Sequence, residues 1–512
     1  MAFAVDNRKI AKNTVALYIR TAITMVIGFF TARITLQLLG SDDYGLNNLV
    51  GGVVSLFSFL NASMGTAVQR FFNIEMGRGN KEKLGKVYGV GLYLHIIVAS
   101  ITFILCEIFA VFFLSKMNIP PERMFAAHVV FQISICSMVL NIINVPNYAL
   151  LKAHEEFSKL AIIEIIQAVL RLGVLLLLYT INFDKLIIYS SLNLGVSLYY
   201  VSSIFFSASK YPESHSKICR DKDLIKKMLG FISMLVVTVL AELGRKQGLV
   251  MIVNIFFGLA VNAAFAIASQ VSHFVSTFVV NIKQPMVPQM MSAYGAGDKR
   301  SMHRLIFMGT KITAILLLLI SLPVMFEMTQ LLTIWLKEPP QFADKLAILV
   351  LINSNISSFT YFLYQGVHAT GNITKQQIIM SSLYVLTLLL ILIAFKLGAN
   401  FYSALYITMA ISTTICIMNM VMAHHYYNLN IGSFLRKCFF PCLFVAGITI
   451  TALWGITSLM EPSWVRLAIV LVGGAGLVAA LGYFLVLEKD ERQKMLSLVH
   501  LDRFVNKKKK TL

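Results

Sequence analysis

Long apolar runs separated by short polar segments fill the chain between residues 14 and 487. A helix that crosses a bilayer needs about 17–25 mostly apolar residues, and fourteen runs reach that length. They lie near 14–39, 45–72, 87–114, 124–149, 160–180, 186–207, 228–256, 261–287, 305–334, 346–369, 377–396, 400–423, 438–459 and 465–487. The pattern predicts an all-α integral membrane protein with fourteen transmembrane helices.

Two stretches of the chain, 218 residues apart, share one layout of apolar helix, polar turn, second apolar helix and basic loop. The matched pairs are Gly40 with Gly258, Gly77 with Gly295, Gly79 with Gly297, Asn80 with Asp298 and Lys81 with Lys299. So long a period indicates two repeated halves. Both halves start from the same side of the membrane, so the repeats are parallel, with two further helices at the C-terminal end.

This repeat predicts the domain organisation. Residues 1–207 would form an N-lobe of six helices, and residues 228–423 a C-lobe of six. The basic segment 208–227, which contains Pro212, would link them. Residues 424–487 would hold helices 13 and 14, and residues 488–512 a basic tail.

Composition and charge placement give the orientation. The chain is 57% hydrophobic and 13% charged, whereas soluble domains carry about 25% charged residues. Of the loop Lys and Arg residues, 29 fall on one face and seven on the other. By the positive-inside rule the first face is cytoplasmic, as are both termini. The lysine tail is expected to touch anionic lipid rather than nucleic acid, and no cleavable signal peptide is expected.

Enzymatic chemistry finds little support in the sequence. No nucleophile–base pair, nucleotide-binding loop or metal-ligand spacing is present, so we predict no catalytic residue, cofactor or metal site. Cys438 and Cys442 are four residues apart, and we interpret the cysteines as small buried hydrophobes. Gly85 and Gly89 at the start of a span indicate close packing of helices.

Eight basic residues fall in or at the ends of the predicted spans, where a charge at the helix centre costs roughly 2.5–3.5 kcal/mol. They are Arg20, Arg33, Arg70, Arg171, Arg245, Lys246, Lys283 and Lys311. Six of them lie on helices 1, 2, 7 and 8, the equivalent hairpins of the two halves. If these hairpins face a central cleft, that cleft would select an anionic substrate.

Structural explanations exist for several of these charges. Arg70, Lys283 and Lys311 lie near span ends, where their side chains can either extend to the interface or face a cavity. Arg20 and Arg33 are 13 residues apart, about 220° around a helix, so one of them would pair with a neighbouring helix.

Two acidic residues are candidates for coupling transport to a counter-ion. Glu164 shares a helix face with Arg171, and the two can instead neutralise each other. Glu242 can pair with Arg245 or Lys246 near the middle of the bilayer, either structurally or as part of a site.

Glycine and proline predict bends in two of these helices. Gly244 and Gly248 flank the polar cluster 242–248 and would permit a bend or local unwinding there. Pro285 and Pro288 predict a second bend beside Lys283.

The segment Leu38-Leu39-Gly40-Ser41-Asp42-Asp43-Tyr44-Gly45-Leu46 resembles the first-loop pattern of the polysaccharide (Wzx-type) flippases. Gly295-Ala296-Gly297-Asp298-Lys299 is similar to a cytoplasmic loop of the same family. These flippases are part of the MOP superfamily, with the MATE drug exporters and the lipid II flippases. The fourteen spans, arranged as six, six and two, fit that superfamily along the whole chain.

The resemblance implies MATE-like V-shaped lobes around a central cavity lined by helices 1, 2, 7 and 8. It implies alternating-access transport of an undecaprenyl-diphosphate-linked oligosaccharide across the bacterial inner membrane, for O-antigen, capsule or exopolysaccharide synthesis. Transport would be driven by the membrane potential, either alone or with H⁺ or Na⁺ as a counter-ion. Membrane lipids and the polysaccharide polymerase machinery would be the partners. The alternative is a MATE-like cation-coupled multidrug antiporter, although helix 1 lacks the acidic residue typical of cation-exporting relatives.

The headgroup site predicted from the in-span charges and the resemblance consists of Arg20, Arg33, Arg70, Arg245, Lys246 and Lys283. The resemblance points to the basic residues of helix 1, Arg20 above all, for contact with the diphosphate.

Overall fold

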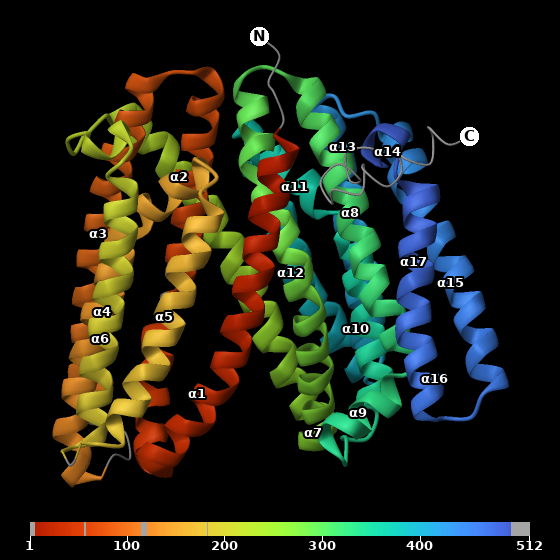
Figure 1. Cartoon of the computed structure of the whole chain (residues 1–512), viewed down its shortest axis with the longest axis horizontal. Helices are drawn as coiled ribbons and strands as arrows, with labels where there is room; N and C mark the ends of the chain where they lie inside the picture. Colours follow the sequence, from red (N-terminus) through yellow and green to blue (C-terminus); the bar gives the residue numbers. More distant parts are fainter. Residues whose placement is uncertain (1–5, 56–57, 114–119, 182, 493–512) are drawn as a thin grey trace, which may run out of the picture. The chain divides into compact units, whose positions relative to one another are not determined.

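The computed structural model describes residues 6–55, 58–113, 120–181 and 183–492, a part of the chain that folds into helices joined by turns (Figure 1). The main helices are α1 (Asn7–Ser55), α2 (Ser58–Arg78), α3 (Lys81–Phe113), α4 (Met124–Ala153), α5 (Phe157–Leu178), α6 (Lys185–Ala208), α7 (Lys222–Gly295), α8 (Lys299–Phe326), α9 (Met328–Leu336), α10 (Ala343–Ser358), α11 (Tyr361–Thr370), α12 (Thr374–Lys396), α13 (Ser403–Tyr427), α14 (Ile431–Phe434), α15 (Phe440–Leu459), α16 (Trp464–Ala468) and α17 (Gly474–Leu481). A π-helical turn joins α14 to α15, and another joins α16 to α17.

Eleven helical segments in the described residues are long and apolar enough to cross a membrane. One of them, α7, is 74 residues long and covers both predicted spans 7 and 8. In addition, α6 lies on the predicted span 186–207, and α2 covers the later part of the predicted span 45–72, whose first residues belong to α1. The prediction of an all-helical protein with many membrane spans is therefore confirmed.

The chain divides into two compact units. The N-terminal unit comprises Lys12–Val236, and the C-terminal unit comprises Met1–Ala11 with Val237–Leu512. In the N-terminal unit α4 packs against α2, α3 and α6 around a core that includes Phe131 and Ile135. In the C-terminal unit α8 packs against α10, α15 and α17, so the last two spans are built onto the same unit as spans 9 to 12.

The matched glycines of the sequence repeat have matching backbones. Gly40 within α1 has φ 75° and ψ 175°, and Gly258 within α7 has φ 78° and ψ −174°. This region of backbone space is accessible almost only to glycine. At each position a single residue turns the chain from one span into the next, so the polar turn predicted after Leu39 is shorter than expected.

The second matched pair ends a span in each half. Gly79 and Gly297 have φ 70° and 78°, the left-handed conformation that typically terminates a helix. The residue after each glycine caps the following helix: Asn80 Oδ1 accepts from Lys83 N at 3.0 Å, and Asp298 Oδ1 accepts from Ser301 N at 2.9 Å. The two halves thus repeat in local chemistry as well as in order.

Two predicted spans are interrupted. The span 305–334 divides at Glu327, where α8 ends and α9 begins. The span 346–369 divides between α10 and α11, at Phe359 and Thr360. Hydropathy averaged over a whole span did not locate these breaks, although Glu327 marks the first and the polar stretch 353–358 precedes the second.

Gly85 and Gly89 accommodate the segment after α6 rather than a neighbouring helix. A Cβ atom at Gly85 would lie 2.4 Å from Ser216 Oγ, and one at Gly89 would lie 2.3 Å from the Lys217 carbonyl oxygen. The expectation of helix packing here is corrected, because the glycine face lies under the chain that leads to α7.

We predict that Gly258→Ala destabilises the protein by about 1–3 kcal/mol, because a Cβ atom is strained in this backbone conformation. The matched control is Gly244→Ala in the same helix, where no heavy atom lies within 4 Å of the added Cβ. Alanine there should leave stability unchanged or raise it by up to about 1 kcal/mol. Thermal unfolding of the purified variants in detergent measures both effects, and equal shifts would contradict the assignment.

Candidate functional site

The first in-span cation is paired with a carboxylate from another helix. Arg20 of α1 donates from Nη1 to Glu164 Oε2 of α5 at 2.6 Å. Tyr148 of α4 donates its hydroxyl to the other oxygen, Glu164 Oε1, at 3.1 Å. Three helices of the N-terminal unit therefore meet at one carboxylate. Glu164 pairs with Arg20 rather than with Arg171 on its own helix.

A polar cavity of about 500 Å³ adjoins this pair inside the N-terminal unit. Glu164 and Arg171 both line it, together with Gln167, Tyr44 and Tyr200. Nearby, the Lys152 ammonium lies 4.4 Å from the centre of the Tyr148 ring. The surroundings of Glu164 thus hold more positive than negative charge, which favours an anion and disfavours a second cation.

Two further predicted cations of this unit are Arg70 and Arg33. Arg70 is buried, with its guanidinium carbon 4.9 Å from the Phe71 ring centre and 5.0 Å from that of Phe231. Such cation–π contacts stabilise a desolvated guanidinium. The side chain of Arg33 lies outside the described residues.

In the C-terminal unit the polar cluster 242–248 forms one unbroken stretch of helix. Lys246 Nζ lies 2.8 Å from Glu242 Oε1, one turn apart on α7. The local unwinding predicted here is wrong, because the interior residue of α7 with non-helical dihedrals is Gly258. Gly248 instead allows close packing: a Cβ atom there would lie 2.8 Å from Leu388 Cδ1.

Backbone dihedrals likewise stay helical through Pro285 and Pro288, so the second predicted bend does not appear as a break in α7.

Two cations of α7 lie on tyrosine rings instead of carboxylates. The Arg245 guanidinium carbon is 5.2 Å from the Tyr384 ring centre, and Lys283 Nζ is 4.6 Å from that of Tyr361. Among the described residues, no carboxylate lies within salt-bridge distance of Arg245 or Lys283. Arg245 Nε is buried without a hydrogen-bond partner in the same part of the chain.

Lys311 of α8 forms buried ion pairs that hold the structure together. It is 1% exposed, and its ammonium lies 2.9 Å from Glu491 Oε2 and 3.3 Å from Glu488 Oε1. Both acids follow the last span, and Lys437 also contacts Glu488 at 3.1 Å. Lys311 therefore neither extends to the interface nor offers a free charge to a cavity.

Comparison with known proteins now bears on this arrangement. Residues 14–177 match the MatE family. Three similar structures are a MATE in the straight conformation, a MOP superfamily transporter from Pyrococcus furiosus and the MATE transporter ClbM in complex with Rb⁺. A search of curated proteins found no match.

These three similarities extend over most of each chain. The MATE in the straight conformation is 13% identical, with a TM-score of 0.69 over 84% of this chain and 96% of that one. The Pyrococcus furiosus transporter is 14% identical, with a TM-score of 0.65 over 83% and 96%. ClbM is 10% identical, with a TM-score of 0.67 over 81% and 94%.

The chain has the fold of MATE and other MOP superfamily transporters, and its residues 14–177 match the MatE family. Its candidate functional groups are the charges that a bilayer helix carries at a cost. On this fold, α1 presents Arg20, and its acidic partner Glu164 comes from α5.

A clamp of three charged residues, which the sequence analysis missed, joins three helical elements at one face of the N-terminal unit. Arg123, at the start of α4, pairs with Asp43 in the first-loop motif and with Asp184 at 2.5 Å, just before α6. Asp184 also caps α6 by accepting from the backbone N–H groups of Leu186 and Ile187. The sequence did offer one indication of this clamp, because Arg123 is one of only seven basic loop residues predicted on that face.

The C-terminal unit has a similar clamp on the same predicted face. Arg466, before the last span, donates to both carboxylate oxygens of Glu327 at 2.8 Å. Glu327 is 1% exposed and lies at the break between α8 and α9. A bidentate pair in a buried position fixes the geometry of that break.

We predict that Arg123→Gln destabilises the N-terminal unit by about 1–2 kcal/mol, since charged hydrogen bonds to two partly exposed carboxylates are lost. Lys185→Gln, an exposed neighbour on the same face, is the matched control and should leave the melting temperature unchanged.

The clamp also has a pH signature. Burial raises the pKa of Asp184, but the hydrogen bonds from Arg123 and the Ile187 N–H outweigh it, so the pKa lies below the ordinary 3.8. The clamp's stabilisation is therefore complete above about pH 4 and is lost as the pH falls through the depressed pKa. Thermal unfolding across this range should show a steeper acid loss for the parent than for Arg123→Gln, and parallel curves would contradict it.

Proposed function

We propose that this transporter is a flippase for an anionic lipid-linked glycan, of the polyprenyl-diphosphate-linked oligosaccharide type. The observation that supports it best is the state of Arg245 and Lys283, two cations of α7 that lie on tyrosine rings without a carboxylate partner in the described residues. They offer positive charge that an anionic substrate can neutralise.

The energetics favour a substrate as the missing partner. A cation at mid-bilayer costs roughly 2.5–3.5 kcal/mol, while a cation–π contact returns about 0.5–2 kcal/mol. Arg245 is thus only partly compensated, unlike Lys246, which pairs with Glu242. Lys283 lies nearer the end of its predicted span, where the cost of its charge is smaller. A charge that is only partly compensated is retained in a folded protein when it serves to bind a ligand.

A phosphate group suits these side chains. Guanidinium presents a planar fork of donors that matches phosphate oxygens, and ammonium supplies a compact point charge. The buried, unpartnered Nε of Arg245 is a donor of this kind. The phosphate could engage either position, and two further predicted cations of the headgroup site, Arg20 and Arg70, belong to the N-terminal unit.

The second candidate is a cation-coupled multidrug antiporter, which the match to MatE and to MATE structures favours. Against it stands the cationic surrounding of Glu164, where a positively charged drug would meet Arg171 and the Arg20–Glu164 pair. One similar MOP superfamily transporter is described as having a binding pocket of reverse polarity. Pocket charge therefore differs within this fold.

Coupling would use the membrane potential together with a counter-ion, H⁺ or Na⁺. Outward movement of a diphosphate is favoured by roughly 2.3 kcal/mol per charge per 100 mV when the inside is negative. Glu164 is the stronger coupling candidate, since it lines a cavity and its neutralisation would release Arg20. Glu242 remains the second candidate, although its partner Lys246 is on the same helix.

Deletion of the gene tests the proposal against the antiporter. We expect undecaprenyl-linked sugar intermediates to accumulate and surface polysaccharide, whether O-antigen, capsule or exopolysaccharide, to fall. Drug hypersensitivity with normal glycan export would favour the antiporter and contradict the flippase.

We predict that Arg245→Gln and Lys283→Gln each lower glycan export by about tenfold, equivalent to losing one charged contact of roughly 1.4 kcal/mol. Lys337→Gln, an exposed loop lysine of the same unit, is the control. Arg20→Ala should impair export while Arg20→Lys retains part, because a point charge keeps the attraction without the bidentate geometry. Full export by an Arg20→Ala, Arg245→Ala double variant at normal abundance would exclude this headgroup site.

We further predict that Glu164→Gln alters the response of transport to an imposed pH or sodium gradient in vesicles. The amide can still accept from Tyr148 but cannot take up a counter-ion or hold the charge of Arg20. Glu242→Gln is measured alongside it. A parental response in the Glu164 variant and a changed one in the Glu242 variant would move the coupling role to Glu242.

A further inference from the structure

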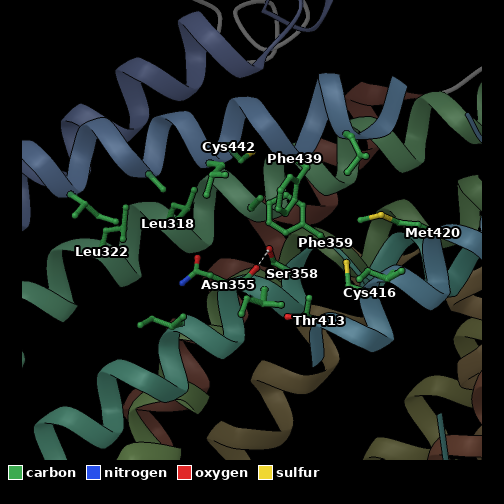
Figure 2. A pocket seen from close by; sticks show the side chains of 18 of the residues that line it. Leu318, Leu322, Asn355, Ser358, Phe359, Thr413, Cys416, Met420, Phe439 and Cys442 are labelled. Carbon is green, nitrogen blue, oxygen red and sulfur yellow. Dashed lines mark hydrogen bonds between the residues drawn. The ribbon is translucent and has the colours of Figure 1, made fainter. Parts of the chain in front are cut away.

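A large apolar cavity of about 920 Å³ lies inside the C-terminal unit, apart from the charged positions of α7 (Figure 2). Side chains of α8, α10 and α13 form one side, represented by Leu318, Asn355 and Met420. The helical segment α14–α15 closes the other side, with Phe439 and Cys442 pointing into it. The cavity therefore separates the bundle of spans 9 to 12 from span 13.

Water is a poor occupant of this cavity. Its hydroxyl groups are already used, since Ser358 donates to the Asn355 carbonyl at 2.7 Å and Thr413 donates to the Met409 carbonyl at 2.9 Å. The Asn355 amide donates to Ser321 and to the Leu351 carbonyl, each at 2.9 Å. Among the described lining residues this leaves Asn355 Oδ1 as a buried acceptor without a partner. A stable buried water needs two to four such partners.

The hollow is not a closed void. Of its lining residues, Ile417, Val421 and Leu443 are 56–57% exposed, so this apolar surface opens to the surroundings of the protein, which in a bilayer are hydrocarbon. Apolar atoms must therefore fill the space. In a bilayer the surrounding acyl chains supply them.

Charge at one end of the cavity indicates which lipid. Ile431 and Leu435 line that end, and the next residue, Arg436, is exposed on the face that carries the excess of Lys and Arg. No carboxylate lies within salt-bridge distance of Arg436 in the described chain, whereas its neighbour Lys437 contacts Glu488. Arg436 also lines a second apolar groove, of about 1140 Å³, and Leu443 lines both hollows.

We propose that this cavity is a binding site for an anionic phospholipid of the leaflet on the basic side. One acyl chain fills the cavity between α15 and the bundle, and the headgroup phosphate contacts Arg436. The groove on the other face of α15 takes the second chain. Anionic headgroups are attracted to basic residues at this membrane surface, and the bound lipid would join span 13 to its unit independently of any transported substrate.

Native mass spectrometry of the purified full-length protein tests the site, with thermal unfolding as the second readout. After detergent washing, the parent should keep a bound phospholipid, and added phosphatidylglycerol should raise its melting temperature more than phosphatidylcholine does, because a ligand of the folded state stabilises it. Ala446→Trp, within the cavity lining, should abolish the lipid-bound peak and the shift. Val472→Trp, 75% exposed, is the control that keeps both.

Two further variants keep the proposal falsifiable if Ala446→Trp fails to fold. Ile450→Trp, a more exposed lining residue, should also lower lipid retention. Arg436→Gln should remove the preference for phosphatidylglycerol over phosphatidylcholine, whereas Arg304→Gln, an exposed arginine of the same unit, should preserve it.

Three results would overturn the site: no phospholipid retained by the parent, equal retention by both cavity-filling variants, or stabilisation by undecaprenyl phosphate alone. The last result would assign the cavity to the tail of the transported lipid. Since none of these measurements follows transport, the site can fail while the proposed function stands, and the reverse.

Discussion

Each positive charge that lies within a membrane-spanning helix must be compensated, because the bilayer interior solvates neither an ammonium nor a guanidinium. The chain meets this requirement in three ways. Arg20 and Lys311 take carboxylates from other helices or from the segment after the last span. Arg70 rests on phenylalanine rings. Within the described residues Arg245 and Lys283 rest on tyrosine rings without a carboxylate, and that incomplete compensation is the basis of the proposed transport of an anion.

The positions of the repeated inter-span turns could be predicted from the sequence. Because Gly40 and Gly258 occupy a conformation that other residues avoid, an alignment of glycines 218 residues apart located both inter-span turns. Apolar run length located the spans for a related reason, since a helix is the structure that satisfies its own backbone in lipid. Fold class and helix positions depend on such local rules.

Side-chain contacts between residues distant along the chain could not be predicted in this way. The acids that hold Lys311 lie about 180 residues further on, in a segment expected from composition to be simply basic. Gly248 was interpreted as a bend, although it accommodates Leu388 from α12. The breaks at Glu327 and after Ser358 depend on packing and on the Arg466 pair rather than on local propensity. In each case tertiary contact outweighed the local pattern.

Reconstitution of the purified protein into liposomes tests the central claim most directly. The measurement follows translocation of a short-chain polyprenyl-diphosphate-linked sugar, detected by its accessibility to an added glycosidase, beside uptake of a fluorescent cationic drug. The account predicts translocation of the anionic lipid-linked sugar and no drug uptake under any imposed gradient. Drug uptake driven by a proton or sodium gradient, with no movement of the sugar, would contradict it.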